Sequence, residues 1–260
     1  MSESRKSPKI VAVCGKGGVG KTSISALLVR SMMKDKDKRV LAIDADPAVG
    51  LATALGFEVY RTVDTIRNDL IGRIQEGRGG DREEILSRLD YEVMDSLVER
   101  DNLAFLAIGR PETVGCYCRV NDLLKDIIRD ISHNFDLVVI DAEAGIEQVN
   151  RRVMEMVSHL LLVSDVSAKG RAVVKSIHDV AERLVSFERT GVLFNRLRDS
   201  LEAGEFTSSM DMPVLGWIGE EELIRQYDRD GKSIPDMPSC NAVEVIDRIV
   251  DSFVFDRVSA

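Results

Sequence analysis

The segment at residues 15–22 constrains the fold of this chain more than any other. It reads GKGGVGKT, follows the apolar run KIVAVC and leads into TSISALLVRSMM, whose apolar residues recur with a helical period. Glycines let successive backbone N–H groups turn toward a phosphate, and the start of the following helix adds partial positive charge. We therefore predict a strand, a phosphate-binding loop and a helix in this order.

This loop predicts a site that binds the phosphates of a nucleotide together with Mg²⁺. Lys21 is expected to reach the β and γ phosphates, and Thr22 is expected to bind Mg²⁺ through its hydroxyl. The other residues expected to line the phosphates are Gly15, Gly17, Gly18, Val19, Gly20 and Ser23.

Short apolar runs rich in Val, Ile and Leu alternate with longer segments of helical period. The predicted strands are Ile10–Cys14, Val40–Asp44, Leu103–Ile108, Leu137–Ile140, Leu160–Val163, Val192–Asn195 and Val214–Ile218. Several are nearly continuous in apolar residues, as expected where helices cover both faces of a parallel sheet. The chain is therefore predicted to be α/β, with a doubly wound, mostly parallel sheet and helices on both faces.

The region between the second and third predicted strands has a helical period instead. Its apolar residues recur at four-residue spacing in two runs, which are Ile66, Leu70, Ile74 and Ile85, Leu89, Val93. The glycine-rich stretch 77–80 separates the runs, so we predict two amphipathic helices joined by a flexible turn. No repeat or linker divides the chain, and we expect a single domain over residues 1–260 with a helical insertion at about 60–100.

The charge balance excludes some function classes. The 260 residues carry 44 Asp and Glu against 35 Lys and Arg, and the net charge of −9 argues against a nucleic-acid binder driven by overall positive charge. No stretch approaches the roughly 18 consecutive apolar residues of a membrane span, and the start of the chain lacks the pattern of a secretory signal. We expect a cytoplasmic protein that binds neither nucleic acid nor membrane.

Carboxylates follow two of the predicted strands. Asp44 and Asp46 close the second strand in the run LAIDADP, and Asp141 closes Leu137–Ile140. Ligands bind at the carboxyl ends of the strands in such sheets. Asp141 therefore fits a carboxylate that acts on Mg²⁺ through water. Asp136, at the start of its strand, is expected to be solvated.

Cys116 and Cys118 form a CxC pair between the third strand and a helical pattern that starts near Val120. On a helix, residues i and i+2 lie about 200° apart and cannot share an ion, whereas on an extended segment they face the same way. The pair therefore requires a loop or strand conformation. Arg119 and the nearby helix start both favour thiolates, the form that binds metal.

Two thiolates make half of a tetrahedral four-sulfur site. No second motif of this kind completes it, and His133, His159 and His178 are isolated, so we expect them to be solvated or capping residues. A second copy of the chain across a two-fold axis would supply the other two sulfurs. A redox-active disulfide and two packed thiols remain alternatives for the pair. Cys14 is expected to be a small core residue, and Cys240 an inert surface or capping thiol that opens the final helix.

The loop GKGGVGKT, with Lys16 directly after its first glycine, resembles the deviant phosphate loop of the MinD/ParA, ArsA and nitrogenase-iron-protein superfamily. This resemblance implies an ATPase that binds ATP and ADP. It also implies that Lys16 reaches the nucleotide of a partner subunit and neutralises charge that develops during hydrolysis. The run IDADP is similar to the first switch of that superfamily. It implies that Asp46 orients the attacking water and that Asp44 supports the loop and the Mg²⁺ shell.

Two further segments carry the resemblance. Residues 142–145 resemble the second switch, which implies that Glu143 and Gly145 belong to the nucleotide site, with Gly145 permitting the backbone to move toward the γ phosphate. Asn195 resembles the asparagine that reads the adenine edge, and the donors and acceptors of its amide suit that role. A structural asparagine at a strand end remains an alternative.

Together, GKGGVGKT, IDADP, GCYC and DAEAGIEQVNRR resemble the CooC-type accessory ATPases that load nickel into carbon monoxide dehydrogenase, and their relatives that serve acetyl-CoA synthase. The resemblance covers nearly the whole chain. It implies a homodimer that binds Ni²⁺ or Zn²⁺ through Cys116 and Cys118 of two subunits and delivers nickel to such a client enzyme. Thiolate tetrahedra suit Zn²⁺, whereas Ni²⁺ often prefers square-planar geometry.

Two other functions remain open. One is an electron-donor ATPase of the nitrogenase-iron-protein type with a 4Fe–4S cluster between subunits. That family takes one ligand per subunit from the second switch, and Ala142–Gln148 contains no cysteine. The other is a MinD/ParA-type positioning ATPase, whose MinD branch uses a basic amphipathic membrane helix. The segment Val243–Val258 carries four acidic residues against two arginines, which disfavours binding to anionic lipid.

Overall fold

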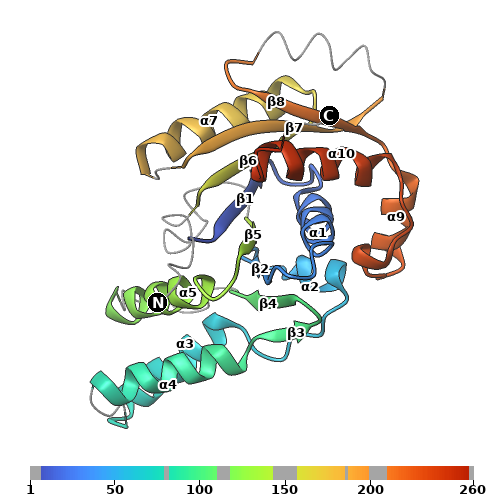
Figure 1. Ribbon diagram of the computed structural model, residues 1–260. Helices are drawn as coiled ribbons and strands as arrows, with labels where there is room; N and C mark the ends of the chain where they lie inside the picture. Colours follow the sequence, from blue (N-terminus) through green and yellow to red (C-terminus); the bar gives the residue numbers. More distant parts are fainter. Residues whose placement is uncertain are drawn as a thin grey trace, which may run out of the picture.

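The computed structural model describes residues 7–78, 82–109, 118–142, 157–184, 187–198 and 210–257. Its centre is a sheet with the strand order β3-β4-β2-β5-β1-β6-β7-β8 (Figure 1). The strands are β1 Lys9–Gly15, β2 Val40–Asp44, β3 Val98–Arg100, β4 Leu103–Ala107, β5 Leu137–Asp141, β6 His159–Ser164, β7 Arg189–Leu197 and β8 Val214–Gly219. Among the described strands, only the pairing of β3 with β4 is antiparallel. The predicted mostly parallel α/β sheet is confirmed.

Seven of these strands match the predicted ones to within a few residues at each end. The eighth, β3, was not predicted. It has three residues, reads VER, and lies half exposed at the edge of the sheet, so it carries no apolar run that could reveal it.

Helices cover both faces of the sheet, as predicted (Figure 1). The helices are α1 Lys21–Met32, α2 Gly50–Leu55, α3 Val63–Gln75, α4 Arg82–Asp95, α5 Cys118–Ser132, α7 Ala168–Leu184, α9 Glu222–Arg229 and α10 Asn241–Ile249, with short helical turns η1 Ile234–Asp236 and η2 Val250–Val254. One core lies between the sheet and α3, α4, α5 and α7, and the other between the sheet and α1, α2, α10 and η2. Successive side chains of β1 alternate between the two cores, because side chains of a strand point to opposite faces.

Cys14 is one of these β1 side chains and is completely buried, which confirms it as a core residue. Burial raises the pKa of its thiol to about 12, so it stays protonated at neutral pH.

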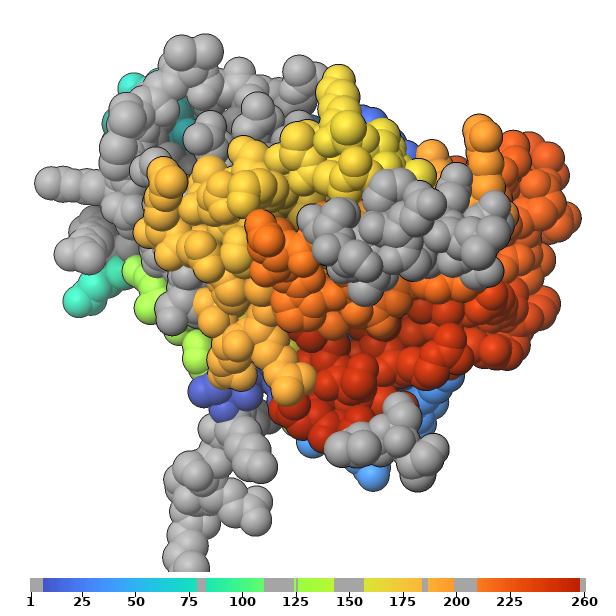
Figure 2. All heavy atoms as spheres, turned by 90° about the horizontal axis from the view of Figure 1, so that it is seen from above, coloured from blue at the N-terminus to red at the C-terminus, as the bar shows by residue number. Residues whose placement is uncertain are grey.

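The apolar face of α10 packs against α1 and β8 and is buried. In Figure 2, seen from above, the orange atoms of β8 lie between α7 in yellow and α10 in red. Among the described residues, no helix combines the length and apolar character needed to cross a membrane.

The prediction that all three histidines are solvated or capping is wrong for His159. This residue begins β6 in the interior of the sheet, is almost fully buried, and lies with its ring 5.3 Å from that of Phe253. Burial lowers the pKa of its imidazole. His133 is exposed at the end of α5, with Nδ1 2.7 Å from the Arg129 carbonyl oxygen. His178 is partly buried on α7, 3.8 Å from Glu182.

The two predicted helices of the insertion are α3 and α4. Thr62 caps the start of α3 by accepting a hydrogen bond from the backbone N–H of Thr65. The predicted apolar stripes are buried at Ile66, Leu70, Leu89 and Val93, but Ile74 is 36% exposed because it lies in the last turn of α3.

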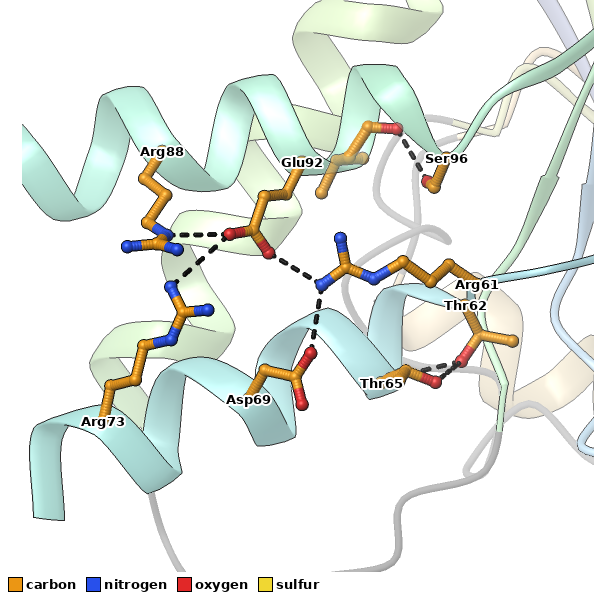
Figure 3. Close-up of polar contacts among 9 residues, drawn as sticks. Arg61, Thr62, Thr65, Asp69, Arg73, Arg88, Glu92 and Ser96 are labelled. Atoms are coloured by element: carbon orange, nitrogen blue, oxygen red, sulfur yellow. Dashed lines mark hydrogen bonds and ion pairs between the residues drawn. The ribbon is translucent and has the colours of Figure 1, made fainter. Parts of the chain in front are cut away.

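A partly buried carboxylate joins α3 to α4 (Figure 3). Glu92 of α4 accepts hydrogen bonds from Arg88 Nε at 2.7 Å and from Arg61 Nη2 at 2.9 Å, and Arg73 Nη1 of α3 lies 3.8 Å away. Arg61 Nη2 also donates to Asp69 of α3 at 3.0 Å. Partial burial raises the pKa of Glu92, but the hydrogen bonds from Arg88 and Arg61 outweigh it and bring the pKa below its ordinary value.

Replacing Glu92 by glutamine should lower the free energy of unfolding at neutral pH by about 1–2 kcal/mol, because the arginines lose a charged acceptor. Since the folded-state pKa of Glu92 is lowered, this stabilisation is present above the unfolded-state pKa of about 4.3 and is lost as pH falls through the folded-state value. Urea unfolding at pH 7 and at about pH 3 measures both effects.

The control is Glu99→Gln, whose carboxylate is 62% exposed and lies 3.6 Å from Arg39. It should change stability little at either pH. A loss for Glu92→Gln that is as small as for Glu99→Gln would contradict the proposed stabilising effect of Glu92.

Candidate functional site

The phosphate loop has the predicted setting, between the end of β1 and the start of α1. Two of its glycines are required by their surroundings. A Cβ on Gly15 would lie 2.1 Å from the carbonyl oxygen of Val163, and Gly20, the N-cap of α1, has φ +92° and would place a Cβ 2.6 Å from Asn195 Nδ2. No acidic residue occupies the first turn of α1, so its partial positive charge is available to an anion.

Lys21 is the first residue of α1 and is almost fully buried, while Thr22 and Ser23 are half-buried beside it. The other loop residues differ in exposure, with Gly17 and Gly18 exposed and Val19 packed into the core below. The structure therefore brings the predicted phosphate-binding residues together in one loop.

Two carboxylates lie side by side next to this loop. Asp44 and Asp141 end the neighbouring strands β2 and β5 and are direct partners in the strand register. The two oxygens of Asp44 accept hydrogen bonds from the backbone N–H groups of Asp46 at 3.0 Å and Leu51 at 2.8 Å. Burial and the charge of Asp141 raise the pKa of Asp44 to about 7.

Asp141 is held by α1. Its Oδ1 accepts a hydrogen bond from the Ser25 hydroxyl at 3.0 Å. Burial raises the pKa of Asp141 to about 6, although nearby hydroxyls and the charge of Lys21 act in the opposite direction. Its Oδ2 is buried and accepts no hydrogen bond from the described residues.

These groups fit a Mg²⁺ ion. A buried carboxylate oxygen without a donor is costly unless a cation or water meets it, and hard oxygen ligands are those that Mg²⁺ prefers. Asp141 and Thr22 would hold the ion, directly or through water, and the ion would neutralise phosphate charge. Asp136, which was expected to be solvated, is exposed at the other end of β5, where it accepts hydrogen bonds from Lys38 and Arg39.

Asp46 lies in the turn that follows β2. Its Oδ1 accepts a hydrogen bond from the Ala48 backbone N–H at 2.9 Å, and its own N–H donates to Asp44. Val49 adopts a left-handed conformation with φ 52° at the start of α2. The turn is therefore folded around the buried Asp44 carboxylate, and the role of Asp46 in orienting water stays a prediction.

Lys16 has a partner that the sequence did not reveal. Its Nζ lies 3.2 Å from Oδ2 of Asp165, the residue that follows β6, and both side chains are about one-third exposed. Asp165 also accepts hydrogen bonds from the backbone N–H and the hydroxyl of Ser167. Partial burial raises the pKa of Asp165, but the hydrogen bonds from Ser167 and Lys16 outweigh it and lower the pKa. In this conformation Lys16 is engaged within its own chain.

Asn195 ends the buried part of β7 beside the phosphate loop. Its Nδ2 donates to the Val19 carbonyl at 2.8 Å, and its Oδ1 accepts from the Arg196 backbone N–H at 3.0 Å. An amide has two donors and two acceptor lone pairs, so one of each remains for a ligand. Asn195 lines a cavity of about 400 Å³ that also contacts Gly20 at the start of α1 and Glu221 before α9. The residue therefore fastens the loop, and it could also read a base.

Several predicted site residues cannot be placed. Cys116, Glu143 and Gly145 lie outside the described residues, and Cys118 is described only as the first residue of α5. Within the described ranges, no group of three or more His, Cys, Asp or Glu side chains is arranged to hold a metal ion by itself. Cys240 is the half-buried N-cap of α10, so it opens the final helix as predicted, and its side chain makes no capping hydrogen bond.

The sequence matches the family described as CobQ/CobB/MinD/ParA nucleotide binding domain over residues 10–234. The chain belongs to this family. It is a nucleotide-binding ATPase of the MinD/ParA type, with the fold predicted from its sequence.

Individual relatives support this assignment. The chain is 34% identical to an uncharacterised ATP-binding protein of Methanocaldococcus jannaschii over 93% of this chain and 98% of that protein. It is 30% identical to the carbon monoxide dehydrogenase accessory protein CooC of Rhodospirillum rubrum over 88% of this chain and 91% of that protein. Its fold is similar to that of the septum site-determining protein MinD from Pyrococcus horikoshii, solved with Mg-ADP, at a TM-score of 0.69 and 19% identity, covering 97% of this chain and 100% of that one.

Replacing Asn195 by alanine should weaken ADP binding by about tenfold, which corresponds to about 1.4 kcal/mol, because the Val19 carbonyl loses its donor and the cavity loses a donor and an acceptor. Isothermal titration calorimetry with Mg-ADP measures the change. Asn134→Ala is the matched control, since Asn134 is exposed and its side-chain amide donates only to the Asp130 carbonyl oxygen, at 3.4 Å. Equal affinities for the two variants would show that Asn195 does not support the nucleotide site.

Proposed function

We propose that this ATPase matures a metallocentre. It acts as a homodimer that binds one nickel or zinc ion through Cys116 and Cys118 of both subunits. It then delivers nickel to an enzyme such as carbon monoxide dehydrogenase or acetyl-CoA synthase. Residues 1–260 act as one domain in this scheme, with the insertion of α3 and α4 as part of it.

The main support for the proposal is the position of β4 and α5, which flank the segment that contains the cysteine pair. β4 runs parallel to β2, and β2 and β5 end in the two carboxylates of the nucleotide site. Because parallel strands end at the same edge of a sheet, the segment between β4 and α5 leaves from the edge that holds the nucleotide site. Cys118 begins α5, and a helix start favours the thiolate form.

The relative named carbon monoxide dehydrogenase accessory protein supports a nickel enzyme as client, because the similarity extends over 91% of that protein. Two thiolates from each of two subunits would complete a four-sulfur site, which suits Zn²⁺ and can also hold Ni²⁺.

Lys16 is the group that would link the nucleotide to dimerisation. ATPases of the MinD/ParA type commonly dimerise. In the dimer, Lys16 would exchange the carboxylate of Asp165 for a phosphate of the partner subunit's nucleotide. The exchange replaces one ion pair by another. A γ phosphate can therefore shift the equilibrium from monomer to dimer without leaving the Lys16 ammonium unpaired. Lys21 and Asp46 would carry out hydrolysis, and Glu143 and Gly145 would respond to the γ phosphate.

Elemental analysis of anaerobically reduced protein tests the proposal. The protein is supplied with nickel or zinc, with ADP or with a non-hydrolysable ATP analogue. We expect about one ion per dimer, because four thiolates complete one site. The ion should be lost in Cys116→Ser/Cys118→Ser, kept in the control Cys240→Ser, and held with an affinity that changes with the nucleotide.

Lys21→Ala separates the two activities in the same experiment. It should abolish ATP hydrolysis, because the β and γ phosphates lose the ammonium expected to contact them, while metal binding persists. Full metal binding by the double cysteine variant would overturn the proposal. Iron and sulfide in place of nickel or zinc would instead assign the chain to the electron-donor ATPases.

A MinD/ParA-type positioning function is compatible with the family and with the solved structures of similar fold. The buried apolar face of α10 counts against membrane attachment through this helix. Co-sedimentation with anionic vesicles in the presence of ATP would reveal such a function.

A further inference from the structure

The exposed large hydrophobic side chains of the described residues are concentrated in one part of the chain. They are Tyr60 at 85%, Ile74 at 36%, Tyr91 at 69% and Met94 at 45%. All four lie between residues 60 and 94, although the described residues extend to 257. Exposed apolar side chains often mark an interaction site where they lie next to one another on the surface.

Two of these side chains share one face of α4. Tyr91 and Met94 are three residues apart, so they lie together on the helix surface, while Leu89 and Val93 point into the core on the opposite side. The exposed residues on the same half of the helix are Glu83, Glu84, Ser87, Asp90 and Asp95. We call this set, with Tyr91 and Met94, the α4 outer face. It has an apolar centre with carboxylates on its flanks.

The inner side of α4 is held firmly. Glu92 binds arginines of α4 and of the segment before α3 (Figure 3), and α4 packs against both α3 and α5. A partner that binds the outer face would therefore meet a preformed helix and would not have to order it, which lowers the cost of binding.

The charges of this face select its partner. Asp90 and Asp95 form no ion pair with any described residue, so their charge is available to a partner's Lys or Arg side chains. A second copy of this chain is a poor occupant, because a two-fold contact would place the same carboxylates opposite one another. The fitting partner has an apolar patch flanked by basic residues.

The position of α4 points to the partner that receives the metal. α4 packs directly against α5, the helix that begins at Cys118. We propose that the α4 outer face is the docking surface for the client metalloenzyme, which would present a basic-flanked apolar patch to Tyr91 and Met94. This inference rests on the proposed function.

Biolayer interferometry with purified, nickel-free carbon monoxide dehydrogenase, taken from the organism that encodes this chain, tests the inference on the full-length protein. Tyr91→Ser/Met94→Ser should weaken binding at least about tenfold, because truncating aromatic residues at the centre of an interface has effects of this size. Asp90→Lys/Asp95→Lys should slow association several-fold at low salt, and the effect should shrink as salt screens the charges.

Tyr60→Ser and Asp37→Lys are the matched controls, since both residues are exposed and lie outside the α4 outer face. Basal ATP hydrolysis and metal per dimer should be unchanged in all four variants, because none of the replaced side chains belongs to the nucleotide site or to the cysteine pair. Thermal unfolding checks that each variant is folded.

The outcomes separate the two proposals. If the unaltered protein binds the enzyme and the outer-face variants bind it equally well, the docking surface is wrong and the metal-delivery function stands. If the unaltered protein does not bind the enzyme at all, the client and its docking surface are both wrong. If Tyr91→Ser/Met94→Ser loses its dimeric state, the face is a contact between subunits and not a docking surface for a client.

Discussion

Two carboxylates placed side by side at the ends of β2 and β5 determine how the rest of the nucleotide site is built. Asp44 and Asp141 are register partners, and burial raises the pKa of both. Such a pair is unfavourable unless donors or cations surround it. Backbone N–H groups of the following turn satisfy Asp44, and Ser25 of α1 binds one oxygen of Asp141, which leaves the other oxygen for a cation. The turn after β2, the start of α1 and the candidate Mg²⁺ site therefore depend on this pair.

The same sheet edge explains how a nucleotide could act on metal chemistry. The phosphate loop, the two carboxylates and the exit of β4 toward the cysteine segment all lie where parallel strands end. Lys16 is held by Asp165 beside this edge, and Asn195 fastens the phosphate loop to β7. Replacement of ATP by ADP would therefore alter the contacts of several neighbouring elements at once. On the face of the sheet opposite α1, the insertion places α4 against α5.

Much of this fold could be predicted from the sequence, because the phosphate loop and the apolar strands are local patterns. The edge strand β3 was missed, since three half-exposed residues carry no such pattern. His159 was misjudged because its burial comes from β6 lying inside the sheet and from Phe253, 94 positions further along the chain. The partnership of Lys16 with Asp165 depends in the same way on β1 lying beside β6. Contacts of this kind arise from strand order, which periodicity does not encode.

The central claim is that four cysteine sulfurs of two subunits hold one metal ion in a nucleotide-controlled dimer. X-ray absorption at the nickel edge, on the reduced and nickel-loaded dimer with a non-hydrolysable ATP analogue, tests it most directly. We expect a first shell of about four sulfur neighbours, which changes when ADP replaces the analogue. A first shell made only of nitrogen and oxygen, unaffected by the nucleotide, would contradict it.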